Sequence, residues 1–170
     1  MATTEGFNLL ADDQARTLIL GSMPSVISLA EQQYYAHPRN AFWPIIAALF
    51  NQGGAVDYQR GQQILIEQNI ALWDVLKSCT RQGSLDSAIE KNSITVNDFM
   101  GFFEAYKGIE RVFFNGGTAE KFYKTYVWRS LPVSAQTLRY TKLPSTSPAF
   151  AAMSYQAKLA AWAVIKEMTE

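Results

Sequence analysis

The chain has very few of the side chains that build most metal and thiol sites. Its 170 residues include one cysteine, Cys79, and one histidine, His37. A disulfide bond within the chain is therefore excluded, and so is any mechanism that needs two histidines. A zinc site that used both residues would still need at least two ligands of other kinds. The composition gives no reason to expect a bound metal.

Long hydrophobic runs are also absent. The longest apolar block, residues 42–50, is far shorter than the ~20 residues that a membrane-spanning helix requires. Glu5, Asp12 and Asp13 stand near the start of the sequence, where a signal peptide would need a basic end followed by an apolar stretch. We therefore expect a cytoplasmic protein that does not act at a membrane.

Neither sign of charge dominates the whole chain, because 15 basic and 15 acidic side chains cancel. The C-terminal third is nevertheless basic, since residues 121–166 contain no Asp or Glu. The basic residues of this segment are Lys121, Lys124, Arg129, Arg139, Lys142, Lys158 and Lys166. Such a segment is a weak indication of a polyanionic partner, although the same clustering also arises on solvated faces.

The order of apolar segments predicts one α/β domain over residues 1–170. Short buried strands are expected at 17–21, 70–75, 109–114 and 137–143, and helices at 40–50, 58–68, 98–106, 118–127 and 153–168. Strands that alternate with helices in this way favour a parallel sheet covered on both faces. We therefore expect a three-layer αβα sandwich with a central four-stranded, mostly parallel sheet.

Ligands of such folds bind beyond the carboxyl ends of the strands, which here means the loops 21–40, 74–81, 115–117 and 143–149. The first loop begins Gly-Ser-Met-Pro-Ser and contains neither a P-loop nor a dinucleotide-binding motif. Ser22 or Ser25 could be a hydrolase nucleophile, but the only histidine, His37, lies in the same loop. A Cys79–His37 pair has no local signature, so neither arrangement is favoured.

Segment 33–44, QYYAHPRNAFWP, resembles the uracil-DNA glycosylase superfamily. Within that superfamily the sequence is most similar to the hypoxanthine-DNA (deoxyinosine) glycosylase branch, close to the mismatch-specific enzymes. The resemblance covers nearly the whole chain in ordered motifs: GSMPS at 21–25, WDVLKSC at 73–79, GSLD at 83–86, FFNG at 113–116 and LPSTSPA at 143–149.

The resemblance implies a uracil-DNA glycosylase-like fold and a monofunctional DNA glycosylase of base excision repair. Such an enzyme flips a deaminated base, with hypoxanthine as the first-choice substrate and uracil or xanthine as secondary ones, and hydrolyses its N-glycosidic bond to leave an abasic site. It implies no cofactor, a monomer, DNA that contains a deaminated base as the partner, and abasic-site repair enzymes downstream. The alternative is a catalytically silent nucleic-acid- or nucleotide-binding module of the same fold.

By this resemblance Asn40 is the catalytic residue. Many members of the superfamily carry a carboxylate or an asparagine in the first turn to position the attacking water, whereas this turn offers Ser22 and Met23. Asn40 is expected to substitute, although an asparagine before a helix also acts as a cap worth ~1 kcal/mol. Other members place a histidine in the last motif, where this chain has Leu143.

The remaining substrate contacts are expected in the same loops. Without that histidine, the backbone N–H groups and hydroxyls of the last motif are expected to stabilise the departing base. The resemblance also implies that Tyr35 stacks on the extruded base. The full set of expected substrate-binding residues is Gly21, Ser22, Pro24, Tyr35, Asp74, Ser145, Thr146 and Ser147.

Asp74 stands where the family usually has an asparagine that reads the base. An ionised aspartate only accepts hydrogen bonds. Hypoxanthine carries a proton on N1, whereas N1 of adenine is a bare acceptor, so a carboxylate facing N1 would favour hypoxanthine and reject adenine. The alternative role for Asp74 is to cap a neighbouring turn.

Contacts to DNA outside the base pocket are expected from the same face. Arg39, Lys77, Arg81 and Lys142 lie in or beside the loops and could bind phosphates. Ala149 or Phe150 is the expected residue to fill the space that the flipped base vacates.

Overall fold

The computed structural model describes residues 2–167 and confirms the predicted central sheet. The sheet has four strands in the order β3-β2-β6-β7: β2 (Thr17–Gly21), β3 (Ile70–Asp74), β6 (Arg111–Asn115) and β7 (Arg139–Leu143). Every neighbouring pair of strands in this sheet is parallel. The chain therefore has the α/β architecture that alternating strands and helices predict.

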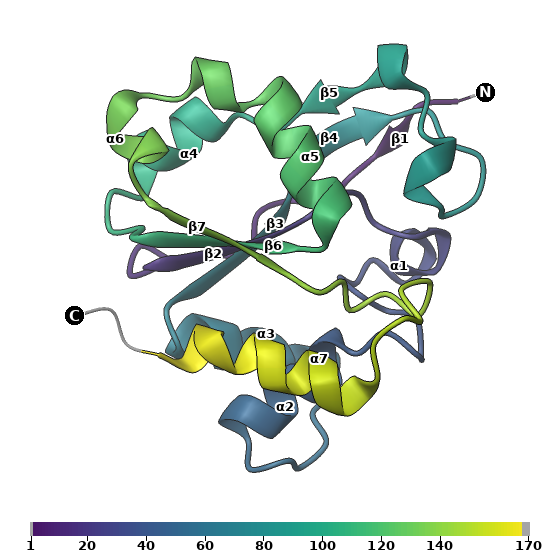
Figure 1. Cartoon of the computed structure of the whole chain (residues 1–170), viewed down its shortest axis with the longest axis vertical. Coiled ribbons are helices and arrows are strands. Elements are labelled where there is room, and N and C mark those ends of the chain that lie inside the picture. Colours follow the sequence, from purple (N-terminus) through teal and green to yellow (C-terminus); the bar gives the residue numbers. More distant parts are fainter. Residues whose placement is uncertain (1, 168–170) are drawn as a thin grey trace.

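Helices cover both faces of this sheet and complete the three layers. Helices α2 (Phe42–Phe50), α3 (Tyr58–Glu67) and α7 (Tyr155–Trp162) lie on one face, and α4 (Phe99–Ala105), α5 (Gly117–Tyr126) and α6 (Val133–Gln136) lie on the other (Figure 1). The helix expected at 153–168 is shorter, because it begins at Tyr155 and passes into a 3₁₀ turn at Ala163–Lys166, and residue 168 lies outside the described residues.

Alternating side chains of the central strand connect the sheet to two apolar cores. All five residues of β2 are buried. Leu18 and Leu20 belong to the core beneath α4 and α5, whereas Ile19 belongs to the core beneath α2, α3 and α7. Burial on both faces explains why this strand is a continuous apolar run.

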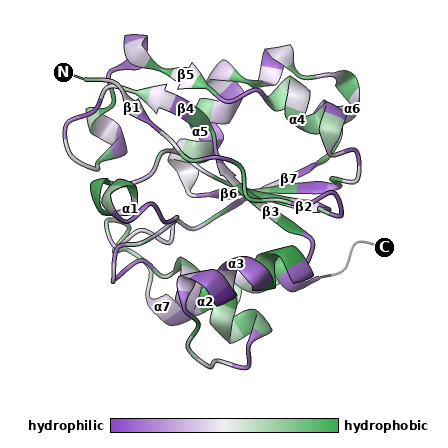
Figure 2. Ribbon diagram, turned by 180° about the vertical axis from the view of Figure 1, so that it is seen from behind, coloured by the Kyte–Doolittle hydropathy of each residue, from purple (hydrophilic) through white to green (hydrophobic). Residues whose placement is uncertain are grey.

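Several elements were not predicted. Beyond the main sheet lies a small antiparallel sheet of β1 (Thr4–Glu5), β4 (Leu76–Cys79) and β5 (Thr95–Val96), in the order β1-β4-β5. The segment expected to be an active-face loop, 74–81, is thus largely strand. Helix α1 (Val26–Glu31) begins inside the predicted loop that follows β2 and is largely hydrophobic (Figure 2). No helix within residues 2–167 is long and apolar enough to cross a membrane.

The register of the main sheet brings the carboxyl ends of its strands together. Gly21 at the end of β2 pairs with Asp74 at the end of β3, and Asn115 at the end of β6 pairs with Leu143 at the end of β7. The loops that follow these four residues therefore meet at one edge of the sheet.

Candidate active site

A cavity of about 230 Å³ lies at this edge. It is bounded by the loops that follow β2 and β7, by the last residues of β3 and β6, Asp74 and Asn115, and by the segment that follows β4. All eight expected substrate-binding residues line it, as do Asn40 and Ala149. Arg39, Lys77, Arg81, Lys142 and Phe150 do not.

Asp74 lies at the end of β3 and is only 3% exposed. Its carboxylate accepts no hydrogen bond from residues 2–167, and Oδ2 is buried without a partner. The carboxylate therefore does not cap a neighbouring turn. Burial raises the pKa of Asp74 to about 7, and the negative charge of Asp86 adds to the rise while Arg81 opposes it.

Gly21 makes room for two polar side chains beside the strand end. A Cβ atom at this position would lie 2.5 Å from Oδ1 of Asp74 and 2.7 Å from the hydroxyl of Tyr35. Both oxygens thus approach the same point of the backbone, which only a glycine permits. Gly21 thus shapes the cavity by leaving room for these side chains, and its expected contact with the substrate stays a prediction.

Tyr35 adopts a left-handed backbone conformation with a φ of 54°. Its ring packs against that of Phe42, with 4.4 Å between the ring centroids. Its hydroxyl is buried without a well-formed hydrogen bond. Burial, and then the charge of Asp74, raise the pKa of this hydroxyl. Asn115 opposes the rise through a weak side-chain hydrogen bond. A buried donor and a buried acceptor, neither with a well-formed hydrogen bond, therefore border the cavity and can bind a polar ligand edge.

Asn40 lies in the turn before α2, one residue ahead of the N-cap residue Ala41, and its catalytic role stays a prediction. Its Oδ1 accepts a hydrogen bond of 2.9 Å from the N–H of Phe42, so the side chain satisfies a backbone donor at the helix start. Oδ1 keeps a second lone pair, and Nδ2 has no partner within the described chain. The backbone N–H of Ala41 donates to the carbonyl of Thr146, which joins this turn to the last motif.

Asn115 was not assigned a role from the sequence, although it organises the last motif. Its Oδ1 accepts from the N–H of Thr146, and its Nδ2 donates to Oγ1 of Thr146, both at 2.9 Å. The N–H of Ser147 donates to Oγ of Ser145. The expectation that backbone N–H groups of this motif bind the departing base is therefore wrong for residues 146 and 147. The hydroxyls remain possible donors.

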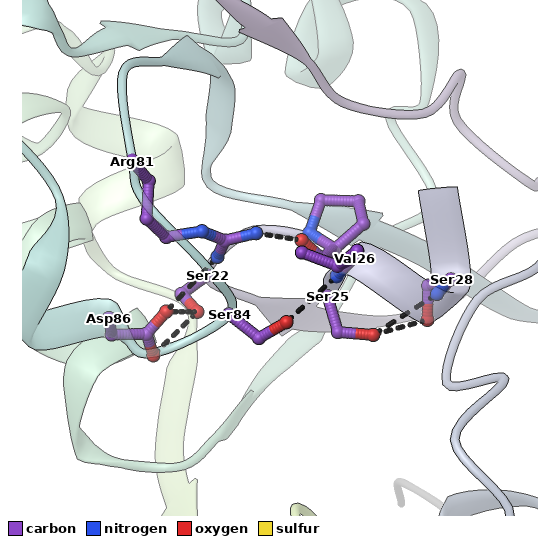
Figure 3. A network of polar contacts seen from close by, with 8 residues as sticks. Ser22, Ser25, Val26, Ser28, Arg81, Ser84 and Asp86 are labelled. Atoms are coloured by element: carbon purple, nitrogen blue, oxygen red, sulfur yellow. Dashed lines mark hydrogen bonds and ion pairs between the residues drawn. The ribbon is translucent and has the colours of Figure 1, made fainter. Parts of the chain in front are cut away.

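Arg81 is buried, so the prediction that it binds phosphate is wrong. One end of its guanidinium donates to the carbonyl of Pro24, and Nη1 lies 3.9 Å from Oδ1 of Asp86 (Figure 3). The side chain of Arg81 is 2% exposed. Pro24 is 57 positions away in the sequence, whereas Asp86 is a near neighbour, and Nη1 is buried with the Asp86 carboxylate nearby but without a hydrogen bond.

Asp86 is a second carboxylate at the cavity, and no role is predicted for it from the sequence. It lies in the segment after β4, and Oγ of Ser22 donates to both of its oxygens, at 3.0 and 2.9 Å. Close by, Oγ of Ser84 accepts from the N–H of Val26 (Figure 3). Burial raises the pKa of Asp86, and Ser22 and Arg81 oppose the rise.

The hydrolase alternatives find no support in the geometry. His37 lines the cavity, but its Nδ1 accepts from the N–H of Arg39, and neither nearby serine bonds to it. Ser22 donates to Asp86, and Ser25 donates to Ser28. Cys79 is fully buried in the core and does not line the cavity. Within residues 2–167 no cluster of acidic, Cys or His side chains could hold a metal.

Arg39, Lys77 and Lys142 are exposed. Phe150 is 37% exposed, and Nζ of Lys158 lies 5.3 Å from the centroid of its ring. These positions are compatible with contacts to DNA, which remain predictions.

Comparisons with known proteins agree on a family. The model of the Uracil DNA glycosylase superfamily matches residues 7–166. A protein named Hypoxanthine DNA glycosylase from Methanosarcina acetivorans is 36% identical over 118 residues, which cover 69% of this chain and 73% of that protein. One of the same name from Methanosarcina barkeri is 34% identical over 113 residues, 66% of this chain and 70% of that protein.

A solved structure extends the similarity to the fold. The solution NMR structure of a "putative Uracil DNA glycosylase" from Methanosarcina acetivorans aligns with a TM-score of 0.75 and 30% identity. The alignment covers 98% of this chain and all of that one.

Proposed function

This chain belongs to the uracil-DNA glycosylase superfamily, and we propose that it excises hypoxanthine from DNA as a monofunctional glycosylase. In this proposal uracil and xanthine are secondary substrates, and the abasic product passes to the later enzymes of base excision repair. The observation that carries the proposal is the cavity itself, which brings Asn40, Tyr35, Asp74 and the last motif together. Two relatives that bear the name hypoxanthine DNA glycosylase support the choice of base.

The cavity suits a single flipped base. Its volume of about 230 Å³ is below the ~300–1,000 Å³ typical of sites for drug-sized ligands. The base would enter beside Tyr35 and present its polar edge to Asp74, whose carboxylate is buried and unpaired. Binding then satisfies groups that are unpaired in the free protein.

Asn40 is proposed to hold the attacking water. An amide cannot take up a proton at neutral pH, but the free lone pair of Oδ1 can accept a hydrogen bond from water. The hydrogen bond from Phe42 fixes the orientation of the carboxamide. Glycosidic cleavage passes through an oxocarbenium-like sugar, so a water held in place by Asn40 can attack as the base departs.

The departing base is proposed to interact with the hydroxyls of the last motif. Thr146 Oγ1 accepts from Asn115, which leaves its own O–H free to donate. One well-placed donor to the developing charge is worth roughly 2.7–4 kcal/mol of the barrier. Asn115 thus orients a donor in the site.

The direct test of the proposed function uses duplex oligonucleotides that carry one deoxyinosine, deoxyuridine or deoxyxanthosine. We expect release of free hypoxanthine and strand scission only after treatment with alkali, because a monofunctional enzyme leaves the abasic strand intact. A duplex with deoxyguanosine at the same position is the control. Binding to the deoxyinosine duplex without base release would favour the silent binding module instead.

Replacing Asp74 with asparagine is expected to narrow the preference for hypoxanthine over adenine at least tenfold. An amide can offer N1 of adenine a donor, whereas a carboxylate repels it. Because the pKa of Asp74 is raised to about 7, the wild-type preference should also widen between pH 6 and pH 8.5 as the group ionises. In Asp74→Asn the preference should not vary in this way.

The measurement for this prediction is the ratio of single-turnover rates on deoxyinosine and deoxyadenosine duplexes at each pH. A ratio that Asp74→Asn leaves unchanged at both pH values would exclude Asp74 as the reader of N1.

A further inference from the structure

The candidate site contains a hydrogen-bonded pair, Ser22 and Asp86, to which the proposed mechanism assigns no role. Hydrolysis requires the attacking water to lose a proton. Asn40 cannot accept one at neutral pH. The neutral form of His37 carries its proton on Nε2, because its Nδ1 accepts from the N–H of Arg39. The nearby groups of the cavity therefore leave the two carboxylates as proton acceptors.

The surroundings of these carboxylates separate their roles. Asp74 is buried without a hydrogen-bond partner. Asp86 is one-third exposed, accepts twice from Ser22 and lies beside the Arg81 guanidinium. Two carboxyl groups whose surroundings separate their ionisation are the usual basis for a division into acid and base. Asp86 is the better stabilised anion of the two.

The hydrogen bonds of Ser22 give its hydroxyl a direction. Its hydroxyl donates to Asp86, and Oγ lies 3.0 and 2.9 Å from the two carboxylate oxygens (Figure 3). The lone pairs of Oγ are therefore free to accept from a molecule in the cavity, which Ser22 also lines. A water that donates to Ser22 Oγ would be connected to Asp86 through a single hydroxyl.

We propose that Asp86 is a positioning residue of the hydrolysis and acts through Ser22 on the attacking water. This role rests on the proposed function. As the C1′–N9 bond breaks, its electron pair leaves with the base and water oxygen bonds to C1′. The proton of the water passes to Ser22 Oγ, and the hydroxyl proton of Ser22 passes to Asp86. The departed base takes one proton from solvent, and Asp86 later returns one, so the net reaction is hydrolysis.

The same contacts could merely hold the segment 81–86 against the segment 22–26. Arg81 with Pro24 and Ser84 with Val26 already join these two segments without Asp86. An asparagine at position 86 keeps an oxygen that accepts from Ser22 but cannot accept a proton. Asp86→Asn therefore separates the proton transfer from the structural contact.

The experiment measures single-turnover hypoxanthine release and binding of the deoxyinosine duplex for Asp86→Asn, Ser22→Ala and the double variant. We expect each single variant to be about 100-fold slower, within the range for a positioned general base, while the Kd for the duplex changes less than about threefold. Because both residues form one relay, the double variant should be no more than about threefold slower than the slower single variant. Glu90→Gln, an exposed carboxylate outside the cavity, is the matched control and should keep the wild-type rate.

A pH profile gives a reading that a purely structural role would not change. The wild-type rate should rise with pH as Asp86 ionises, and this acid limb should be lost in Asp86→Asn. The other titratable or charged groups around the pair, namely Asp74, Arg81, His37 and Tyr35, are present in both proteins.

The outcomes separate the two proposals. If the wild type is active and either Asp86→Asn or Ser22→Ala releases hypoxanthine within threefold of the wild-type rate, the relay is overturned. The proposed function then still stands. The relay is also overturned if the rate loss of the double variant equals the product of the two single-variant losses. If Asp86→Asn does not fold, Ser22→Ala decides alone, since it leaves Asp86 beside Arg81. A wild type that binds the deoxyinosine duplex and releases no base overturns the proposed function and the relay together.

Discussion

Replacing Asn40 with alanine is expected to slow hypoxanthine release about 1,000-fold, the upper end of the effect of removing one positioned polar group from a catalytic site. The carboxamide is proposed to hold the attacking water through Oδ1, which Phe42 keeps in a fixed orientation. Alanine removes that acceptor and nothing in the neighbouring turn replaces it. The measurement is the single-turnover rate on a deoxyinosine duplex, with Kd measured in parallel and expected to stay within about threefold.

The cap-like hydrogen bond that Asn40 accepts from the first residue of α2 requires its own control. Loss of a side-chain cap costs ~1 kcal/mol of stability, so the free energy of unfolding should fall by about that amount in Asn40→Ala. Asn40→Ser keeps a short acceptor for the N–H of Phe42 but removes the amide, and it should regain the stability without regaining the rate. If Asn40→Ala kept its rate within threefold, Asn40 would be a cap alone.

The main sheet could be predicted because its signals are local. Strand β2 is a continuous apolar run that ends in glycine, and each following strand is separated from the last by a helical segment. The rule that ligands bind at the carboxyl ends of parallel strands then placed Asn40, Asp74 and Ser145 around one cavity. The weakly patterned strands β1, β4 and β5 are two to four residues long and carried no such signal.

The polar network around the site could not be predicted, because its contacts join distant parts of the chain. Ser22 and Asp86 are 64 positions apart, and Arg81 and Pro24 are 57 apart. A charged residue in a loop normally indicates a solvated side chain, so Arg81 was assigned to phosphate rather than to the interior. Asn115 offered a better sequence signal of a structural role, since it ends a buried strand and is followed by a glycine. In the structure that glycine, Gly116, has a φ of 95° and turns the chain beside Ser145.

Asp74 should lower the stability of the folded protein at every pH at which its carboxyl group is ionised. Its ordinary pKa of 3.8 applies in the unfolded chain, and burial raises the pKa to about 7 in the folded protein. The folded state thus binds the proton more tightly, so the contribution of Asp74 to stability is fully present below about pH 4. It is lost as the pH rises towards 7 and changes little above that. At about 1.4 kcal/mol per pKa unit, the full loss is on the order of 4 kcal/mol.

Asp74→Asn is therefore expected to be more stable than the wild type at pH 8, by up to that amount, and by only about 1 kcal/mol at pH 4.5, where the unfolded carboxyl is already mostly ionised. Urea denaturation at several pH values measures the difference between the two proteins, in which the titration of Asp86 and of the other carboxyl groups largely cancels. Curves that stay parallel from pH 4.5 to pH 8 would show that Asp74 has an ordinary pKa. If Asp74→Asn is more stable and also discriminates poorly against adenine, the same carboxylate sets both the stability of the protein and its choice of base. The unpaired carboxylate that destabilises the empty protein is the group that the N1–H of hypoxanthine would satisfy.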